Sequence, residues 1–304
     1  MNQKELVEKI NKLKKEKNAI VLAHTYQNVE IDEVADFSGD SLFLSQQAAK
    51  TNADIIVFAG VYFMAETAKI LSPNKKVLLP DLHAGCAMAD KINLKQLREF
   101  KAKYPNIPVV CYVNSTAEVK AESDICCTSA NAVNVVKSLN TKEVLFAPDK
   151  NLGRYVESQL DGVKVITYDG FCPIHHEITK EDVEKQKNLH PNAVVMVHPE
   201  CQKDITEMAD FVGSTTAIIK AVKESSADEF IIVTEKGVVD RLKRDCPQKN
   251  FVLIKSSAIC ESMKLITLEN ILSTLETENN EIFVPEEIAK LAVNAIDKMV
   301  KINS

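Results

Sequence analysis

An internal repeat with a period of about 87 residues is the feature that most constrains how this chain can fold. Three apolar, β-branched runs, at residues 19–27, 108–116 and 193–201, each end in polar side chains. Equivalent residues in the three copies lie 88 and then 86 positions apart. The matching sets are His24, Tyr112 and His198; Tyr26, Asn114 and Glu200; Asp36, Asp124 and Asp210; and Ser41, Ser129 and Thr215. So many matches at one interval indicate three copies of one structural unit.

Each repeat also contains a second and a third apolar run, separated by segments with helical patterns. The second runs lie at residues 53–60, 142–148 and 229–237. The third runs each lead to a cysteine, and these cysteines are Cys86, Cys172 and Cys260. Continuous apolar strands that alternate with helices are typical of parallel sheets covered on both faces. We therefore predict an α/β fold of three αβα sandwich domains, each with at least three parallel strands.

The repeat sets the expected domain limits at residues 1–86, 87–172 and 173–263. The tail, residues 264–304, has an amphipathic helical pattern at 286–300 and is expected to pack back on the first domain. In open parallel sheets, ligands bind beyond the carboxyl ends of the strands. If pseudo-threefold symmetry relates the three domains, these ends converge on one central cavity. We predict the active site at this central domain junction.

Composition narrows the class of protein. The net charge of −6 argues against a nucleic-acid or membrane-surface partner. The longest mostly apolar run, residues 55–65, is too short to span a bilayer, and the N-terminus is charged where a signal peptide would be apolar. We expect a cytoplasmic protein whose eight cysteines stay reduced. No Cys-x-x-Cys, GxGxxG, Walker A or HExxH pattern occurs in the sequence.

The hydroxyl residues Ser41, Ser129 and Thr215 are predicted to begin the next helix of each repeat. Such a residue is by default a helix N-cap, but the same position offers free N–H groups and a positive dipole end to an anion. Three in equivalent places favour a site for a small ligand with several negative charges. Glu235, after the second strand of the third repeat, is interpreted as a solvated loop residue, with a cavity residue as the alternative.

The repeat singles out Cys86, Cys172 and Cys260 among the eight cysteines. Three thiolates on a threefold axis fit three corners of a cubane iron–sulfur cluster, which leaves one iron open to act as a Lewis acid. The other cysteines are interpreted as small buried hydrophobes or inert thiols: Cys111, Cys126, Cys127, Cys201 and Cys246. A zinc site is the alternative, in which Cys172 and His175 combine with His198 and Cys201.

Several stretches resemble the quinolinate synthase family, and the similarity covers nearly the whole chain. The matching stretches are AHTYQ at 23–27, DFSGDS at 36–41, PDLHAGCAMAD at 80–90, CYVNSTAEVKAESDICCTSANAV at 111–133, GFCPIHHEI at 170–178, HPEC at 198–201, GSTTAII at 213–219 and CESMKLITL at 260–268. The resemblance implies three αβα domains related by pseudo-threefold symmetry, as the repeat indicates independently.

The resemblance also implies an activity, that of a transferase of NAD biosynthesis. The family condenses iminoaspartate with dihydroxyacetone phosphate and releases quinolinate, phosphate and two waters. An L-aspartate oxidase or an aspartate dehydrogenase is the expected supplier of iminoaspartate. The family cofactor is a 4Fe-4S cluster with three cysteine ligands and one open iron, here Cys86, Cys172 and Cys260. The implied substrate-binding residues are His24, Ser41, Tyr112, Asn114, Ser129, His198, Glu200 and Thr215.

The implied catalytic residues are Glu200, Tyr26, His198 and His175. Glu200 is the best general base, because it is the only carboxylate among the residues that end the first runs. We expect a dry cavity and neighbouring anions to raise its pKa. His198 can orient a carboxylate or move a proton, and Tyr26 can donate a proton or cover the cavity. Two other functions stay open: an iron–sulfur sensor without catalysis, and an aconitase-like hydro-lyase that acts on a single substrate.

Overall fold

The computed structural model describes residues 1–303 and contains three separate four-stranded parallel sheets. The first sheet has the order β2-β1-β3-β4, with β1 Ala19–His24, β2 Phe37–Gly39, β3 Ile55–Ala59 and β4 Lys76–Leu78. The second has the order β6-β5-β7-β8, with β5 Val109–Tyr112, β6 Ile125–Cys127, β7 Glu143–Ala147 and β8 Lys164–Thr167. The third has the order β10-β9-β11-β12, with β9 Val194–Val197, β10 Phe211–Val212, β11 Glu229–Val233 and β12 Asn250–Leu253.

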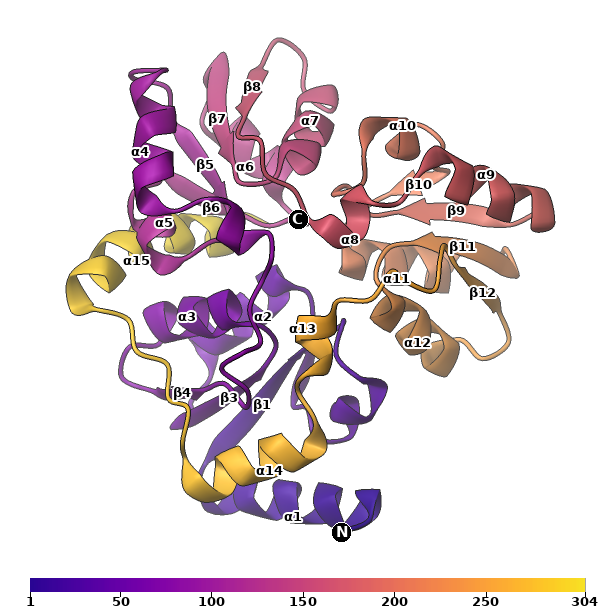
Figure 1. The fold of residues 1–304 in the computed structure, drawn as a ribbon. Coiled ribbons are helices and arrows are strands. Elements are labelled where there is room, and N and C mark those ends of the chain that lie inside the picture. The colour runs from indigo at the N-terminus through magenta and orange to yellow at the C-terminus, as the bar shows by residue number, and fades with distance from the viewer. Residues whose placement is uncertain (304) are drawn as a thin grey trace.

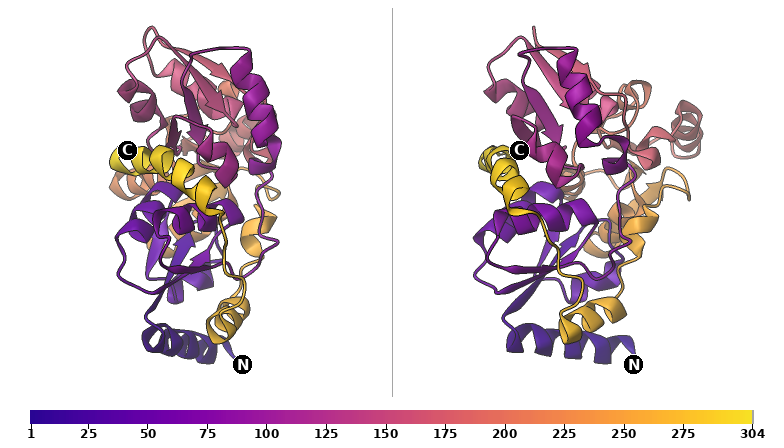
Figure 2. Two further views of the ribbon diagram at one scale, coloured as in Figure 1. Left: turned by 90° about the vertical axis from the view of Figure 1, so that its left-hand side faces the viewer. Right: turned by 60° about the vertical axis from the view of Figure 1, so that its left-hand side comes forward.

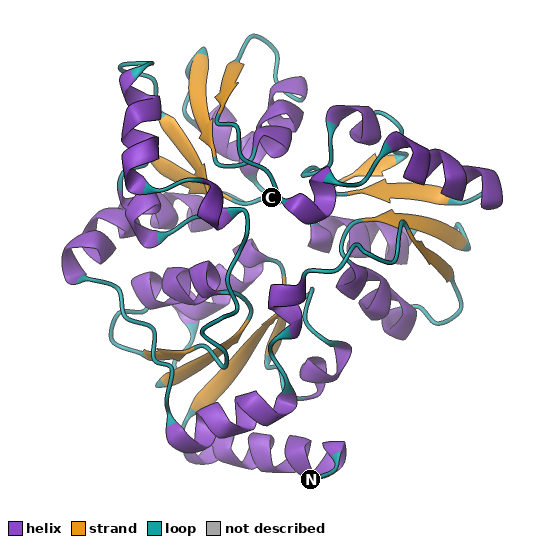
Figure 3. Cartoon of the chain, viewed as in Figure 1, coloured by secondary structure: helices purple, strands orange, loops and turns teal. Residues whose placement is uncertain are grey.

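Each sheet with its helices forms one unit, and the three units surround a common centre (Figure 1). Helices flank the strands of each unit, as the colouring by secondary structure shows (Figure 3). The predicted α/β fold of three αβα sandwiches with parallel sheets is confirmed. The residue limits of the domains, at 86, 172 and 263, stay a prediction.

The helices alternate with the strands along the chain. In the first unit they are α1 Gln3–Glu16, η1 Val29–Glu33, α2 Ser41–Lys50 and α3 Tyr62–Leu71. In the second they are η2 Ala89–Lys91, α4 Leu94–Ala102, α5 Ala117–Ala121, α6 Ala132–Ser138 and α7 Lys150–Ser158. The third contains α8 Pro173–His176, α9 Lys180–Leu189, α10 Lys203–Thr206, α11 Thr215–Glu224 and α12 Lys236–Asp245, and the tail contains α13 Glu261–Lys264, α14 Leu268–Thr277 and α15 Glu286–Lys301.

The repeated aspartates explain a fourth strand that the sequence pattern did not reveal. The carboxylates of Asp36, Asp124 and Asp210 accept the backbone N–H groups of Val21, Val109 and Val195, at 2.7, 2.7 and 2.8 Å. Each bond ties the start of the short strand β2, β6 or β10 to the neighbouring first strand of its sheet. These three aspartates are therefore structural, because they fix the edge strand of each unit.

Two of the three hydroxyl residues begin helices as expected, although neither is the N-cap. Asp40 and Ser214 are the N-caps of α2 and α11, so Ser41 and Thr215 occupy the first helical position instead. Ser129 lies in a turn, and α6 begins only at Ala132. The side chain of Asn131 accepts the N–H of Thr128 at 2.9 Å and thereby closes this turn before the helix. The expected helix start is therefore confirmed at Ser41 and Thr215 and wrong at Ser129, and none of the three residues is the N-cap of its helix.

The C-terminal tail joins two units. Helix α14 packs on α1 of the first unit, whereas α15 lies against α5 and β6 of the second unit and against α2 and α3 of the first (Figure 2). Asn131 donates its side-chain N–H groups to the carbonyls of Met299 and Ile302, at 3.0 and 2.8 Å. One continuous apolar core consequently runs through the first two units and α15, while the third unit has two cores of its own. Among residues 1–303, no helix combines the length and apolar character needed to cross a bilayer.

Candidate active site

A cavity of about 70 Å³ lies where the carboxyl ends of the strands meet at the centre of the three units. This volume is several times the ~15 Å³ that one water molecule requires. The predicted site residues all line this cavity: His24, Tyr26, Ser41, Cys86, Tyr112, Asn114, Ser129, Cys172, His175, His198, Glu200, Thr215 and Cys260. The structure therefore brings together residues from all three repeats.

Two equivalent histidines in the first and third units adopt the same local geometry. Nδ1 of His24 accepts the backbone N–H of Tyr26 at 3.1 Å, and Nδ1 of His198 accepts that of Glu200 at 3.3 Å. Burial lowers the pKa of both rings to about 3, so both are neutral at pH 7. In a neutral ring whose Nδ1 is an acceptor, the proton resides on Nε2. Each histidine can therefore donate one N–H bond to an anion in the cavity.

In the second unit, Tyr112 is the equivalent of the two histidines, and Asn114 is the equivalent of Tyr26 and Glu200. Oδ1 of Asn114 is buried and accepts no hydrogen bond from any residue in the described range 1–303. A buried acceptor without a partner is unusual in a folded protein. Because Asn114 lines the cavity, this oxygen is available to a ligand donor.

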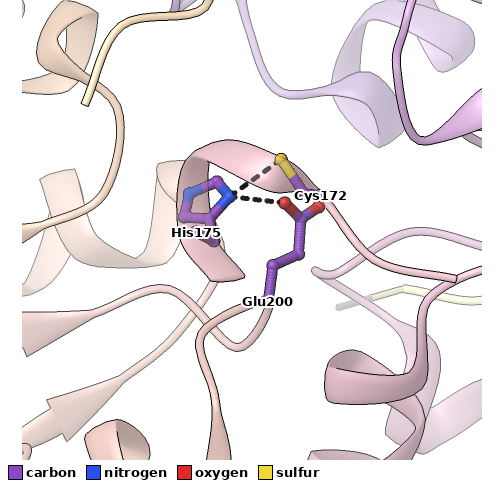
Figure 4. A group of neighbouring side chains, drawn as sticks. All are labelled: Cys172, His175 and Glu200. Carbon is purple, nitrogen blue, oxygen red and sulfur yellow. Dashed lines mark hydrogen bonds and ion pairs between the residues drawn. The ribbon is translucent and has the colours of Figure 1, made fainter. Parts of the chain in front are cut away.

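Glu200 is the centre of a buried hydrogen-bonded group (Figure 4). One carboxylate oxygen accepts the O–H of Tyr112 at 2.5 Å, and the other lies 2.7 Å from Nδ1 of His175. Nδ1 of His175 is also 3.3 Å from the sulfur of Cys172, and its Nε2 is 2.8 Å from the hydroxyl of Thr234. The ring of His175 stacks on that of His198, with centroids 4.7 Å apart.

These partners shift the pKa of Glu200 in the direction opposite to the one expected. Burial alone raises the pKa, but the nearby His175 and His198 and the bond from Tyr112 lower it to about 2. The expectation of a raised pKa is wrong, because it considered the dry cavity and not the donors that fill it. Glu200 is ionised at neutral pH in this arrangement, which is the form that a general base needs.

The three repeat-related cysteines enter the cavity from equivalent loops, one in each unit. Burial is the largest influence on all three thiols: it raises the pKa of Cys86 to about 12, that of Cys172 well above its ordinary value, and that of Cys260. The backbone N–H groups of Ala89, His175 and Met263, each three residues further on, oppose this rise. Binding of a metal must therefore displace protons from these thiols.

The donor set fits a cluster of several irons better than a single ion. Cys172, His175 and Glu200 form the one group of possible ligand atoms within 4.8 Å of each other that the described residues contain. The three cysteine sulfurs are not such a group, so they do not all lie within 4.8 Å of one another. A single tetrahedral zinc binds each sulfur at about 2.3 Å and would bring the sulfurs closer together than that. Three thiols spaced around one cavity suit a polynuclear iron–sulfur cluster, which thiolates hold.

The alternative zinc site is not assembled. Cys201 is buried, and its thiol points to the carbonyl of Val233 at 3.7 Å rather than into the cavity. The remaining cysteines outside the repeat, Cys111, Cys126, Cys127 and Cys246, are also buried and lie in apolar cores, as expected.

Two polar side chains of the cavity region, Lys264 and Thr234, escaped the sequence interpretation, and Glu235 is not solvated as expected. Glu235 is fully buried rather than solvated and pairs with Lys264 at 3.1 Å. Lys264 also donates to the carbonyl of Tyr26, while Thr234 bonds the hydroxyl of Tyr26 at 3.1 Å. The expectation that Glu235 is solvated is wrong, whereas the alternative of a cavity residue is confirmed, because Glu235 is buried and lines the cavity. The repeat held a usable signal, since Glu235 lies 86 residues after Asp149.

Comparisons with known proteins give one family for the whole chain. The family model described as quinolinate synthetase A protein matches residues 8–301. The chain is 53% identical over 302 residues to a quinolinate synthase of Alkaliphilus metalliredigens, covering 99% of this chain and 100% of that protein. It is 49% identical over 298 residues to a quinolinate synthase of Thermodesulfovibrio yellowstonii, covering 98% of each chain. It is 51% identical over 294 residues to one of Dehalococcoides mccartyi, covering 97% of each.

Proposed function

Since the chain belongs to the quinolinate synthetase A family, we propose that it is a quinolinate synthase of NAD biosynthesis. The reaction condenses iminoaspartate with dihydroxyacetone phosphate and gives quinolinate, phosphate and two waters, which makes the enzyme a transferase. The observation that carries the proposal is the convergence of residues from three repeats on one cavity with donors for anions and three thiols. An L-aspartate oxidase or aspartate dehydrogenase would supply iminoaspartate, and we propose a cytoplasmic location, where thiols stay reduced.

The proposed cofactor is a 4Fe-4S cluster held by Cys86, Cys172 and Cys260. Bound there, it would supply a Lewis acid through the iron that has no protein ligand. Its support is the chemistry of the donor set: three thiols, equivalent in the repeat, that line one cavity.

The protein's own residues bind the charged substrates. The first turns of α2 and α11 carry Ser41 and Thr215, and their free N–H groups and hydroxyls suit a phosphate or a carboxylate. Ser129 adds a hydroxyl from the turn before α6. The neutral His24 and His198 donate Nε2–H bonds to carboxylate oxygens without adding charge.

Proton transfer falls to the group around Glu200. Its carboxylate holds the O–H of Tyr112 and the Nδ1 of His175, so both side chains have fixed orientations. We assign Glu200 the role of general base, with His175 and His198 as neighbours that pass or receive the proton. Tyr26, anchored by Thr234, covers the cavity from the first unit and can act as a proton donor.

A direct assay tests the proposal. Anaerobic protein mixed with iminoaspartate and dihydroxyacetone phosphate should form quinolinate, measured by chromatography. A sensor would form none, and a hydro-lyase would convert a single substrate. Iron analysis of Cys86→Ala, Cys172→Ala and Cys260→Ala should show loss of a cluster with about four irons per chain. Cys111→Ala, Cys201→Ala and Cys246→Ala are the matched controls and should keep it. A full cluster in Cys172→Ala would overturn the cofactor assignment.

A further inference from the structure

Each cysteine loop is attached to the start of one helix by the same backbone hydrogen bond. The first N–H of α3, α7 and α12 belongs to Tyr62, Lys150 and Lys236. These groups donate to the carbonyls of Ala84, Gly170 and Ala258, each at 2.8 Å. Every acceptor lies two residues before the cysteine of its unit. The three loops are therefore docked in the same way on the helix that follows the second strand.

The residue just before these helices differs among the three units. The equivalent positions, 88 and then 86 residues apart, are Val61, Asp149 and Glu235. Valine makes no side-chain cap, whereas the two acids cap their helices by accepting the N–H of Leu152 at 2.8 Å and of Gly237 at 2.6 Å. Only the second and third units thus carry a carboxylate at this position.

The second oxygen of each carboxylate accepts the backbone N–H of a cysteine. Oδ2 of Asp149 accepts the N–H of Cys172 at 3.2 Å, and Oε1 of Glu235 accepts that of Cys260, also at 3.2 Å. Each acid therefore bridges a helix start and one of the proposed cluster ligands. The same arrangement in two units of different sequence argues against coincidence.

A buried carboxylate destabilises the folded protein unless hydrogen bonds to both of its oxygens offset the loss of hydration. Asp149 and Glu235 are 0% exposed. Neutral Ser, Thr or Asn would cap a helix equally well without the cost of burying a charge. Oε1 of Glu235 has Lys264 at 3.1 Å as a counter-ion. What a carboxylate offers beyond a neutral cap is a second acceptor, and in both units it is used on the cysteine.

We propose that Asp149 and Glu235 are positioning residues for the iron–sulfur cluster, each fixing the backbone of one ligand cysteine. The inference rests on the proposed function, because it takes Cys86, Cys172 and Cys260 as the ligands. Cys172 and Cys260 are then held by both a loop bond and a carboxylate, and Cys86 by the loop bond alone. The cluster is anchored more firmly on the second and third units than on the first.

Amide variants separate this role from helix capping. In Asp149→Asn the side-chain oxygen can still accept the N–H of Leu152, but the new NH₂ group then faces the N–H of Cys172, donor against donor. Glu235→Gln places an NH₂ group against Cys260 as well, but it also removes the ion pair of the same oxygen with Lys264, so Asp149→Asn is the cleaner of the two variants. Asn93→Ala is the matched control, because it removes the side-chain cap of α4, which accepts the N–H of Gln96 and bonds no cysteine.

The test measures release of iron to a chelator from anaerobically loaded protein, together with the electron paramagnetic resonance spectrum of the reduced cluster. Release should be at least about tenfold faster in Asp149→Asn and Glu235→Gln, and within about twofold of wild type in Asn93→Ala. The conservative Glu235→Asp, which keeps two oxygens, should partly restore slow release. If Asp149→Asn does not fold, Asp149→Ser keeps one acceptor without an opposing donor and replaces it.

Two failures can be told apart. Wild-type protein that takes up no cluster would overturn the proposed function itself. The positioning role would be overturned if the wild-type protein holds a full cluster and both amide variants show wild-type rates of iron release and wild-type spectra. The proposed function would then still stand.

Discussion

Replacement of Glu200 by glutamine separates two roles that the structure permits for this carboxylate. In the first, Glu200 removes a proton from the substrate. In the second, it only orients Tyr112 and His175, which lie 2.5 and 2.7 Å from its two oxygens. Glutamine keeps the shape of the side chain and one acceptor, but it cannot take up a proton at neutral pH.

The hydrogen bonds around Glu200 set the size of the effect. In Glu200→Gln, Tyr112 can still donate to the amide oxygen, and the amide NH₂ can donate to Nδ1 of His175 if the ring proton moves to Nε2. Nε2 can then donate to the hydroxyl of Thr234, 2.8 Å away. The number of hydrogen bonds is thus preserved, and only their charge assistance is lost, about 1 kcal/mol. A positioning role therefore predicts a rate loss of less than about tenfold, whereas loss of a general base costs roughly 10² to 10⁴.

We expect Glu200→Gln to lower kcat for quinolinate formation at least about a hundredfold while the cluster and substrate binding are retained. The assay is anaerobic turnover at saturating substrates, with iron analysis of each sample. Cys201→Ala is the matched control, since Cys201 is the next residue, is equally buried and does not line the cavity. A kcat within tenfold of wild type in Glu200→Gln, with a full cluster, would refute the role as base.

Three further outcomes are expected. Activity should fall in air or with a chelator and return with iron, sulfide and reductant, and equal activity in a chelated aerobic sample would rule out the cluster as catalyst. Lys17 and Lys76 each donate a hydrogen bond of 2.6 Å to Glu278 and lower its pKa from 4.5 to about 2. These bonds therefore stabilise the folded protein above pH 4.5, and their contribution is lost as the pH falls toward 2. Urea unfolding between pH 2 and 5 should therefore depend less on pH in Glu278→Gln, and an unchanged slope would contradict the assignment. A Cβ on Gly237 would lie 2.7 Å from Cα of Tyr26, so Gly237→Ala should destabilise the protein by about 1–3 kcal/mol in a thermal melt, contrary to an ordinary helical Gly→Ala change, which stabilises.

The repeat alone was enough to predict the architecture and the location of the site. Continuous apolar strands require parallel sheets with both faces covered, and the carboxyl ends of parallel strands share one edge. Because His24, Tyr112 and His198 lie at those ends in the three repeats, the repeat also predicts that they lie close together in space. The structure brings all three into one cavity.

Features that depend on contacts between repeats could not be predicted in this way. The pKa of Glu200 is lowered because Tyr112 from the second unit and His175 from another loop both reach it. Ser129 fails to begin a helix because Asn131 closes a local turn and bonds the distant tail instead. Hydroxyl spacing in the sequence carries no information about either partner.

The position of α15 also has a consequence for the timing of synthesis. Ala292, Ile296 and Met299 complete the core that the first two units share, yet α15 begins about 160 residues after β6, on which it packs. At about 5–20 residues per second, a ribosome needs roughly 8–30 s to cover that distance. Once β8 is made, at Thr167, the strands of both units are complete, but the apolar seam between the units stays uncovered for the rest of this interval. A growing chain must therefore be protected at that seam until its last helix emerges.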